Sequence, residues 1–290
     1  MNRIQCPRFW VLMVGVLLPF IVACSKKEVL TIAGSSTVLP VVSKVAESFR
    51  QAHPHLNVIV NGGGSGVGIN QVGEGWVDIG MTSRVLTAEE YKRYRGVNFI
   101  THPIGKDAVL PVVSSEIYDS GVQSLTLEQI GQIYKGEITN WKSLGGPDRE
   151  ILCIDKEASR GTRHVFMEAV FGDSDQAQTE APGADLVLGS NNETQSALTQ
   201  SNAAIGMLSF AWLNDDVKGL SIQTPKGMLV APNLETIHSG EFPIIRDLLL
   251  VTNGEPQGAA KAFMDFILGR KGREIVTVAG YVPLAFDPLD

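Results

Sequence analysis

The stretch Asn61-Gly62-Gly63-Gly64-Ser65-Gly66-Val67-Gly68-Ile69-Asn70 decides the fold of this chain. It follows an apolar run at 56–60 that is typical of a β-strand, and it leads into a segment from Ile69 that can begin a helix. Glycines between a strand and a helix let the backbone pass close to a ligand and leave amide N–H groups free to point at it. The stretch therefore indicates an α/β unit with a ligand loop, although taken alone it also fits a flexible surface turn.

Two further loops have the same form, at 34–38 and 159–163, because each follows an apolar strand and precedes a helix. In parallel α/β sheets, ligands bind beyond the carboxyl ends of the strands. Helix N-termini at that edge offer unpaired N–H groups and the positive end of the helix dipole, and serine and threonine hydroxyls add donors. Helix capping explains any one such loop, but three together predict a site for a small tetrahedral oxyanion.

Strands alternate with helices along the chain, and the alternation restarts near residue 115. This order predicts an α/β protein with two mixed, mostly parallel sheets, helices on both faces and a cleft between two lobes. Extended runs at 98–104 and 108–114 surround Gly105-Lys106-Asp107, and an apolar strand at 244–252 returns. We therefore expect lobe 1 at 29–112 plus 244–290, and lobe 2 at 113–243.

The N-terminus has the features of an export signal. Arg3 and Arg8 flank the start of an apolar run at 9–23, which has the length of a signal core and is short for a membrane span. The run ends in Ile21-Val22-Ala23-Cys24, which resembles a bacterial lipobox. We expect a signal peptide at 1–23, lipid on Cys24, a polar tether at 24–28, and an extracytoplasmic protein anchored to a cell membrane, facing the periplasm if the cell is Gram-negative. An uncleaved signal anchor is the alternative.

Composition argues against several functions. The net charge of -7 over 290 residues does not suit a nucleic-acid partner, which needs clustered basic residues. The glycine stretch lacks the Gly-Lys-Ser/Thr of a P-loop and the last glycine of a dinucleotide fingerprint, and neither Ser36 nor Ser65 sits in a Gly-x-Ser-x-Gly elbow. The histidines have no metal-ligand spacing, and no pair of cleft carboxylates is evident. We expect no metal, no cofactor and no catalysis.

Several motifs resemble the phosphate-binding proteins of bacterial phosphate ABC importers. They are Ala33-Gly34-Ser35-Ser36-Thr37-Val38, Gly64-Ser65-Gly66, the segment 78–84, Gly161-Thr162-Arg163, and 127–130 with 136–141. The likeness runs from about residue 31 to residue 283 in the right order. It implies a type II periplasmic-binding fold with two crossing strands and phosphate clamped in the cleft. It also implies an ABC permease as partner, and we expect a monomer.

The resemblance also implies the ligands of the phosphate. Ser36 and Thr37 would bind it from the first helix start, Ser65 from the second, and Gly161 and Thr162 from the second lobe.

Four further residues complete the predicted site, and three of them, Ser83, Lys156 and Arg160, stand at positions where the sequence departs from the family pattern. Ser83, with Arg84 beside it, stands where an acidic residue usually accepts the proton of phosphate. Lys156 replaces an arginine, and it can supply a charge but not a planar fork. Arg160 replaces a serine, so that either Arg160 or its neighbour Ser159 would serve the ligand.

These departures leave other functions open. Without the acidic acceptor, sulfate, arsenate or molybdate could replace phosphate. A sensory lipoprotein without a transporter and a phosphoester hydrolase using the same anion cradle are further alternatives.

Overall fold

The structure is a computed structural model that describes residues 28–172, 179 and 181–284. The predicted signal peptide, Cys24 and the tether up to residue 27 lie outside the described residues. Across the described part of the chain, no helix is both long enough and apolar enough to cross a membrane.

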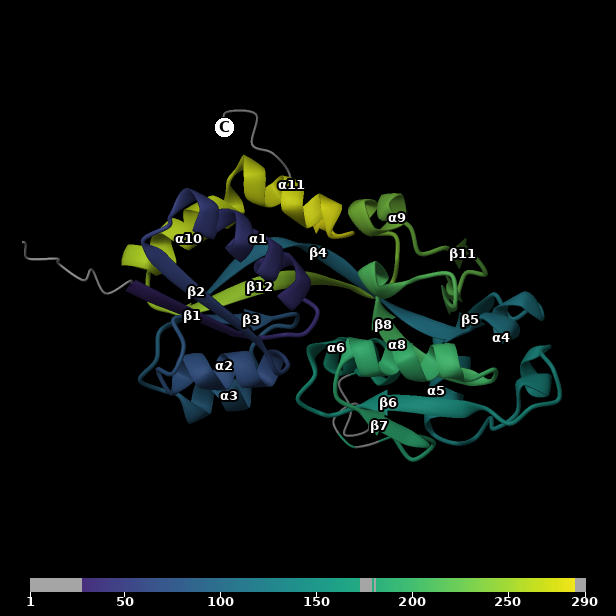
Figure 1. The fold of residues 1–290 in the computed structure, drawn as a ribbon. Helices are drawn as coiled ribbons and strands as arrows, with labels where there is room; N and C mark the ends of the chain where they lie inside the picture. Colours follow the sequence, from purple (N-terminus) through teal and green to yellow (C-terminus); the bar gives the residue numbers. More distant parts are fainter. Residues whose placement is uncertain (1–27, 173–178, 180, 285–290) are drawn as a thin grey trace, which may run out of the picture.

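The first lobe is a twisted sheet between two layers of helices (Figure 1). Its strands run in the order β2-β1-β3-β12-β4, and β1 (Glu28–Gly34) pairs in parallel with β2 (Leu56–Gly62) and β3 (Ile79–Thr82). One face is covered by α1 (Leu39–Ala52), α10 (Gly258–Leu268) and α11 (Arg270–Val278), and the other by α2 (Ser65–Gly73) and α3 (Ala88–Arg93). The carboxyl ends of β1, β2 and β3 lead into the loops that the sequence singled out.

Two long antiparallel strands connect the lobes. They are β4 (Phe99–Ser114), with 16 residues, and β12 (Ile245–Asn253), whose register shifts between Leu248 and Leu249. The sequence suggested two extended runs on either side of Gly105-Lys106-Asp107, and the structure has one continuous strand there. Gly105 fits because a side chain there would meet the backbone of β13 (Val282–Pro283), and Asp107 is consequently a buried strand residue.

The second lobe continues the sheet from β4. There β8 (Ala204–Ser209) and β9 (Val217–Gly219) pair with β4, and β6 (Leu152–Lys156) lies between β8 and β7 (Leu186–Leu188). A smaller sheet has the order β11-β10-β5, built from Leu229–Val230, Ser221–Gln223 and Ser124–Thr126. The helical elements are α4 (Ser115–Asp119), α5 (Leu127–Tyr134), η1 (Trp141–Leu144), α6 (Gly161–Phe171), α8 (Asn191–Gln200), η2 (Phe210–Trp212) and α9 (Leu234–Ser239).

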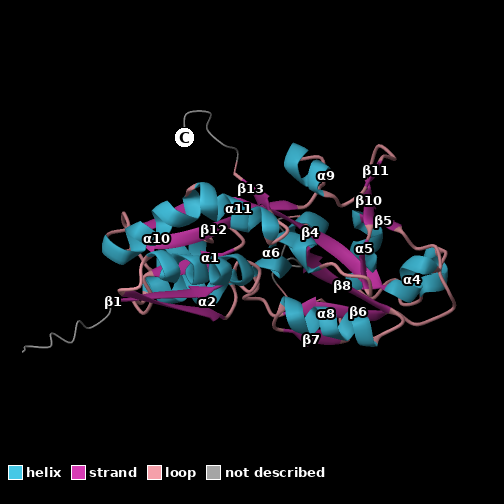
Figure 2. Cartoon of the chain, turned by 45° about the horizontal axis from the view of Figure 1, so that its top comes forward, coloured by secondary structure: helices cyan, strands magenta, loops and turns pink. Residues whose placement is uncertain are grey.

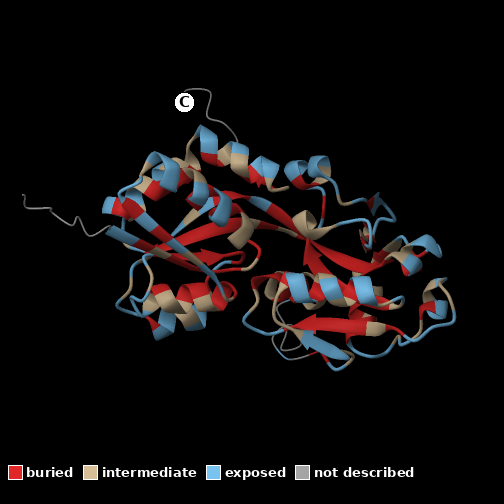
Figure 3. Ribbon diagram, viewed as in Figure 1, coloured by how far each residue is buried: buried red, intermediate tan, exposed pale blue. Residues whose placement is uncertain are grey.

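Each lobe has its own hydrophobic core, and the buried residues follow the strands (Figure 3). Along β4 the core changes between Ile104, in the first cluster, and Ala108, in the second. Along β12 the core changes between Ile245, which packs against the second cluster, and Leu248, in the first. Figure 2 shows the resulting two groups of strands and helices, joined along β4. The predicted two-lobed α/β architecture is confirmed, with the sheets of both lobes forming one ten-stranded ladder through β4.

Candidate functional site

A small cavity lies where the N-termini of α1, α2, α6 and α8 meet. Its volume is about 10 Å³, which is roughly the room needed by one water molecule, so the two lobes lie closed over it. The structure brings most of the predicted site residues together there. The described residues that line the cavity are Ser35, Ser36, Thr37, Gly64, Ser65, Ser83, Lys156, Arg160, Gly161, Thr162, Gly189 and Asn191.

The hydroxyls of the first lobe form a connected group. Ser35 Oγ accepts the amide N–H of Thr37 at 3.2 Å and donates to Ser83 Oγ at 3.0 Å. The amide of Ser83 donates to Ser65 Oγ at 3.0 Å, and the two hydroxyl oxygens are 3.3 Å apart. Ser36 is half-buried at the cavity. The loops after β1, β2 and β3 therefore deliver their hydroxyls to one place.

Glycines allow the lobes to touch. A Cβ on Gly161 would collide with the Oγ of Ser65 and lie 2.6 Å from Ser83 Oγ. Gly66 of the first lobe donates its amide N–H to the carbonyl oxygen of Ser159 in the second at 3.1 Å. Closure therefore depends on two close approaches. The backbone of Gly161 approaches the serine side chains of the first lobe, and the backbone of Gly66 approaches the backbone of Ser159.

The second lobe supplies Thr162 and a residue that sequence reasoning missed, Asn191. The Oγ1 atoms of Thr162 and Thr37 are 3.3 Å apart, and Asn191 Nδ2 donates to Thr37 Oγ1 at 3.0 Å. Asn191 opens α8, whose start is fixed by a capping box between Ser190 and Glu193. That box marks a helix start in the sequence but carries no sign that it faces the cavity.

Lys156 is a buried cation at the cavity. Its Nζ donates to the carbonyl of Ser190 at 3.0 Å and to Thr194 Oγ1 at 2.6 Å. Burial, reinforced by the positive charges of Arg160 and Arg246, lowers the pKa of Lys156 to about 7. An anion placed in the cavity would favour the charged form of this amine.

Arg160 lines the cavity and reaches from the second lobe to the first. Its Nε and Nη2 donate to Glu157 Oε2 at 2.8 and 2.5 Å, and its Cδ would be 3.1 Å from a Cβ on Gly64 in the other lobe. Of the two residues that the sequence left open, Arg160 lines the cavity, whereas the carbonyl of Ser159 is bonded to Gly66.

Arg84 does not line the cavity in this structure, unlike the other predicted residues. Its Nη1 and Nη2 donate to the two carboxylate oxygens of Glu90 at 2.8 and 2.6 Å. Glu90 in turn completes the capping box of α3 with Thr87. The guanidinium is thus held by a partner on the side of α3.

Arg246 and Asp107 form a buried ion pair beneath the hydroxyls, and sequence reasoning missed both. Arg246 donates to Asp107 Oδ2 from Nε at 3.0 Å and from Nη2 at 2.7 Å. Its Nη1 reaches Ser83 Oγ at 3.2 Å and Thr162 Oγ1 at 3.1 Å, and its Nη2 reaches Thr37 Oγ1 at 3.2 Å. The available signal was an arginine in an apolar strand and an aspartate beside a buried run.

The charge of the site suits an anion. The described residues that line the cavity include two cations, Lys156 and Arg160, and no carboxylate. Over the same described part of the chain, no group of three His, Cys, Asp or Glu side chains could hold a metal ion. The arrangement can bind an oxyanion through hydroxyls, amides and positive charge.

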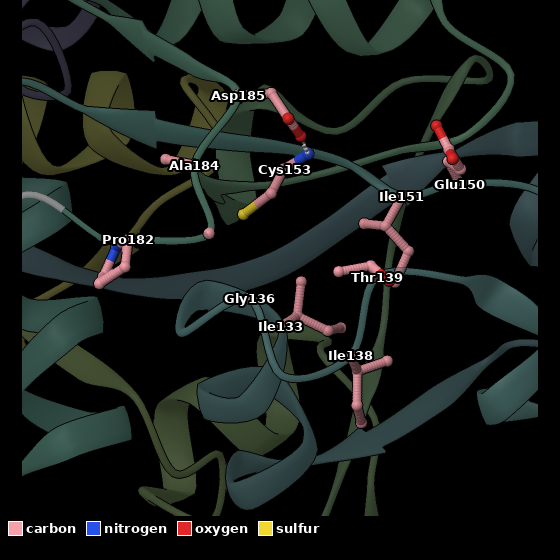
Figure 4. A pocket seen from close by; sticks show the side chains of 11 residues that line it. Ile133, Gly136, Ile138, Thr139, Glu150, Ile151, Cys153, Pro182, Ala184 and Asp185 are labelled. Carbon is pink, nitrogen blue, oxygen red and sulfur yellow. Dashed lines mark hydrogen bonds between the residues drawn. The ribbon is translucent and has the colours of Figure 1, made fainter.

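A larger pocket of about 500 Å³ lies in the second lobe and holds none of the predicted site residues (Figure 4). Cys153 lies there beside Asp185, whose carboxylate accepts the Cys153 amide N–H at 2.8 Å. Burial raises the pKa of the Cys153 thiol, which therefore stays protonated.

The comparisons with known proteins agree with this geometry. Residues 22–271 match the model of the PBP superfamily domain. The phosphate-binding protein PstS of Bacillus subtilis is 33% identical over 257 residues, covering 88% of this chain and 80% of that protein. A crystal structure of a phosphate ABC transporter substrate-binding protein with bound phosphate from Clostridium perfringens has a TM-score of 0.78 at 31% identity, over 89% of this chain and 100% of that one.

An ABC-type phosphate transport receptor from Vibrio cholerae has a TM-score of 0.70 at 30% identity, over 87% of this chain and 99% of that one. The predicted type II fold and the predicted family are thereby confirmed. The chain belongs to the PBP superfamily and, within it, to the PstS family of phosphate-binding proteins.

Proposed function

We propose that this protein captures inorganic phosphate between its lobes and delivers it to an ABC importer. The observation that carries the proposal is the closed cavity at which helix starts from both lobes meet, lined by hydroxyls and by Lys156 and Arg160. The named relatives support it, since one is a phosphate-binding protein and another holds phosphate in its crystal structure.

Binding follows from the donors. Ser36, Thr37 and Ser65 act from the first lobe and Gly161 and Thr162 from the second, with Ser83 acting beside Ser65. Lys156 and Arg160 add charge. Charge-assisted hydrogen bonds to an anion are stronger than neutral ones, and closure of the lobes excludes the water that would compete. Arg84 is not part of this proposed set, because Glu90 holds it.

The protein acts as a binding protein and makes or breaks no bond. Binding yields the closed protein with phosphate between its lobes. The permease recognises this closed form and opens the lobes. Released phosphate then passes through the permease, and the empty protein returns to capture the next anion.

Calorimetric titration of the purified protein with phosphate tests the proposal. We expect saturable binding with one phosphate per chain, and we expect Thr162→Val, which removes a hydroxyl at nearly constant shape, to weaken it by roughly 10- to 100-fold. A folded protein that shows no phosphate affinity would refute the function. Uptake of phosphate by cells with and without the gene separates transport from a purely sensory role.

We further propose that the protein is an extracytoplasmic lipoprotein, held at the membrane through Cys24, and a monomer. The lipobox-like Ile21-Val22-Ala23-Cys24 supports the anchor. Labelled fatty acid should be incorporated into the wild-type protein, and Cys24→Ala should abolish the label and move the protein out of the membrane fraction. Label that persists in Cys24→Ala would place the lipid elsewhere.

Other tetrahedral oxyanions form a second candidate, favoured by the lack of a carboxylate among the described cavity residues. Competition of sulfate, arsenate and molybdate against bound phosphate measures how far the site accepts them.

A further inference from the structure

Arg246 makes contacts that fix the direction of the hydroxyl hydrogen bonds around the cavity. A guanidinium carries donors and no acceptor, so every hydroxyl that it touches must use a lone pair to accept from it. Arg246 touches Thr37, Ser83 and Thr162, which come from both lobes. Its own position is fixed because Asp107, fully buried, accepts from it twice and also accepts from Ser209 Oγ at 2.8 Å.

A first chain of hydrogen bonds starts at Ser83. Its oxygen accepts from Arg246 Nη1 and from Ser35, which occupies both of its lone pairs. The Ser83 proton is then free for Ser65 Oγ, 3.3 Å away, which also accepts the Ser83 amide at 3.0 Å. The proton of Ser65 has to point elsewhere, and Ser65 lines the cavity.

A second chain joins the two threonines. Thr37 Oγ1 accepts from Arg246 Nη2 and from Asn191 Nδ2, so that both of its lone pairs are occupied. Thr162 Oγ1 accepts from Arg246 Nη1 and lies 3.3 Å from Thr37 Oγ1. If Thr37 donates its hydroxyl proton to Thr162, the hydroxyl proton of Thr162 is directed to the cavity. If Thr37 does not donate to Thr162, the hydroxyl proton of Thr37 is directed to the cavity. Either way the pair presents a donor.

We propose that Arg246 is a positioning residue that turns these hydroxyls into hydrogen-bond donors, so that the site selects unprotonated ligand oxygens. The inference rests on the proposed function and specifies its ligand. The site should favour the phosphate dianion, which has one protonated oxygen, over the monoanion, which has two, because each protonated ligand oxygen needs an acceptor that the oriented hydroxyls do not supply. For the same reason it should accept sulfate, a tetrahedral dianion without a proton.

The other charged groups around the cavity affect both anions. Lys156 and Arg160 line it, Glu157 is paired with Arg160, and Glu193 lies near Gly189 at the start of α8. Protonation of Lys156 at lower pH should strengthen the binding of any dianion. Sulfate does not titrate over this pH range, so its affinity reports the protein alone, and the ratio of phosphate to sulfate affinity isolates the protonation of phosphate.

The test is calorimetric titration of the wild-type protein with phosphate and, separately, with sulfate from pH 5.5 to 8.5. We expect the phosphate-to-sulfate ratio of association constants to rise by about tenfold or more, in parallel with the dianion fraction of phosphate. We also expect sulfate to bind within roughly 100-fold of phosphate at pH 8, whereas a site that reads a ligand proton with a buried acceptor rejects the analogue by about 10⁴ or more.

Variants separate orientation from simple stabilisation. Arg246→Met should weaken both anions by roughly 10- to 100-fold and flatten the pH dependence of the ratio, because the freed hydroxyls can rotate and accept. Arg246→Lys keeps the positive charge but loses the planar guanidinium, and it should flatten the pH dependence of the ratio in part. Arg50→Met removes an arginine that bonds Val58 O away from the cavity, and should leave the ratio and its pH dependence unchanged.

The outcomes are distinct. A wild-type ratio that is flat with pH, or sulfate that fails to bind while phosphate binds, overturns the inference and leaves the proposed function standing. Arg246 variants that weaken both anions equally at every pH, with the wild-type profile retained, also overturn it. A folded protein that binds neither anion overturns the proposed function itself. If Arg246→Met does not fold, the wild-type measurements and Arg246→Lys still decide.

Discussion

At Gly161 the second lobe meets two serine hydroxyls of the first lobe with no room for a side chain. The cost of overfilling such a contact is typically about 1–3 kcal/mol. We expect Gly161→Ala to weaken phosphate binding by roughly 10- to 100-fold, because it hinders closure, and to change the melting temperature of the ligand-free protein little.

The matched control for this substitution is Gly96→Ala, where a Cβ would meet nothing within 4 Å. Calorimetry and thermal unfolding of both variants check the prediction. Unchanged affinity in Gly161→Ala would show that binding does not require the closed contact described here.

Lys156 gives a pH dependence whose sign follows from its burial. Its pKa is about 7 in the folded protein, below its ordinary value of 10.5, mainly because burial disfavours the charged form. Between those two values the unfolded chain binds more protons than the folded one, so stability rises with pH in this window. The penalty of burying the charge is fully present below pH 7.

We expect the free energy of unfolding of the ligand-free wild type, minus that of Lys156→Met, to rise by roughly 2–3 kcal/mol from pH 7 to 9.5, since one pKa unit corresponds to about 1.4 kcal/mol. Urea unfolding at the two pH values measures it. If the difference in the free energy of unfolding does not change with pH, the pKa of Lys156 is not lowered in the folded protein. Lys156→Met should also weaken phosphate binding, because it removes a cation from the cavity.

At the scale of elements, a helix start serves either the cavity or the packing of its own lobe. The starts of α1, α2, α6 and α8 all contribute residues to the cavity, whereas the start of α3 is occupied by its capping box and by the fork from Arg84 to Glu90. The chemistry of the residues is similar in both cases. What differs is where the sheet places the helix.

We therefore expect the pair between Arg84 and Glu90 to contribute to stability and not to ligand binding. We expect Glu90→Gln to lower the free energy of unfolding by about 1–2 kcal/mol, because it weakens a charge-assisted pair and a cap. Arg84→Ala should leave the phosphate dissociation constant within about threefold of the wild type, a change of roughly the size expected for a residue outside the contact set. A tenfold or greater loss of phosphate affinity in Arg84→Ala would show that Arg84 contributes to phosphate binding.

At the scale of the whole molecule, β4 and β12 are the only described strands that continue from one hydrophobic core to the other. Direct contacts between the lobes also lie at the cavity, among them the bond from the Gly66 amide to Ser159 O. That amide is in the first turn of α2, where a helix offers it no internal partner, so its bond exists only while the lobes are closed.

Hydrogen exchange at Gly66 should therefore report closure. We expect phosphate at 100 times its dissociation constant to slow exchange of this amide by roughly tenfold or more, because the ligand favours the closed form. The amide of Gly68, which bonds Gly64 O within the first lobe, is the control and should change less. Equal protection at both amides would indicate general stabilisation instead of closure.

The sequence by itself determined the class of the fold and most of the cavity. Strand–loop–helix periodicity predicted two α/β lobes, and the serine, threonine and glycine residues at the helix starts predicted an oxyanion site. These signals are local, because periodicity and helix starts are properties of neighbouring residues. The predicted signal and Cys24 remain predictions, since they lie outside the described residues.

Only the tertiary structure decided how the loops are connected and which charges face the ligand. Asp107 and Arg246 are separated by 139 residues, and their pairing depends on the register of two antiparallel strands. Arg84 and Arg160 look alike in the sequence, but Arg84 is paired with Glu90 of α3, whereas Arg160 lines the cavity. Side-chain direction depends on contacts made across the fold, which no local pattern encodes.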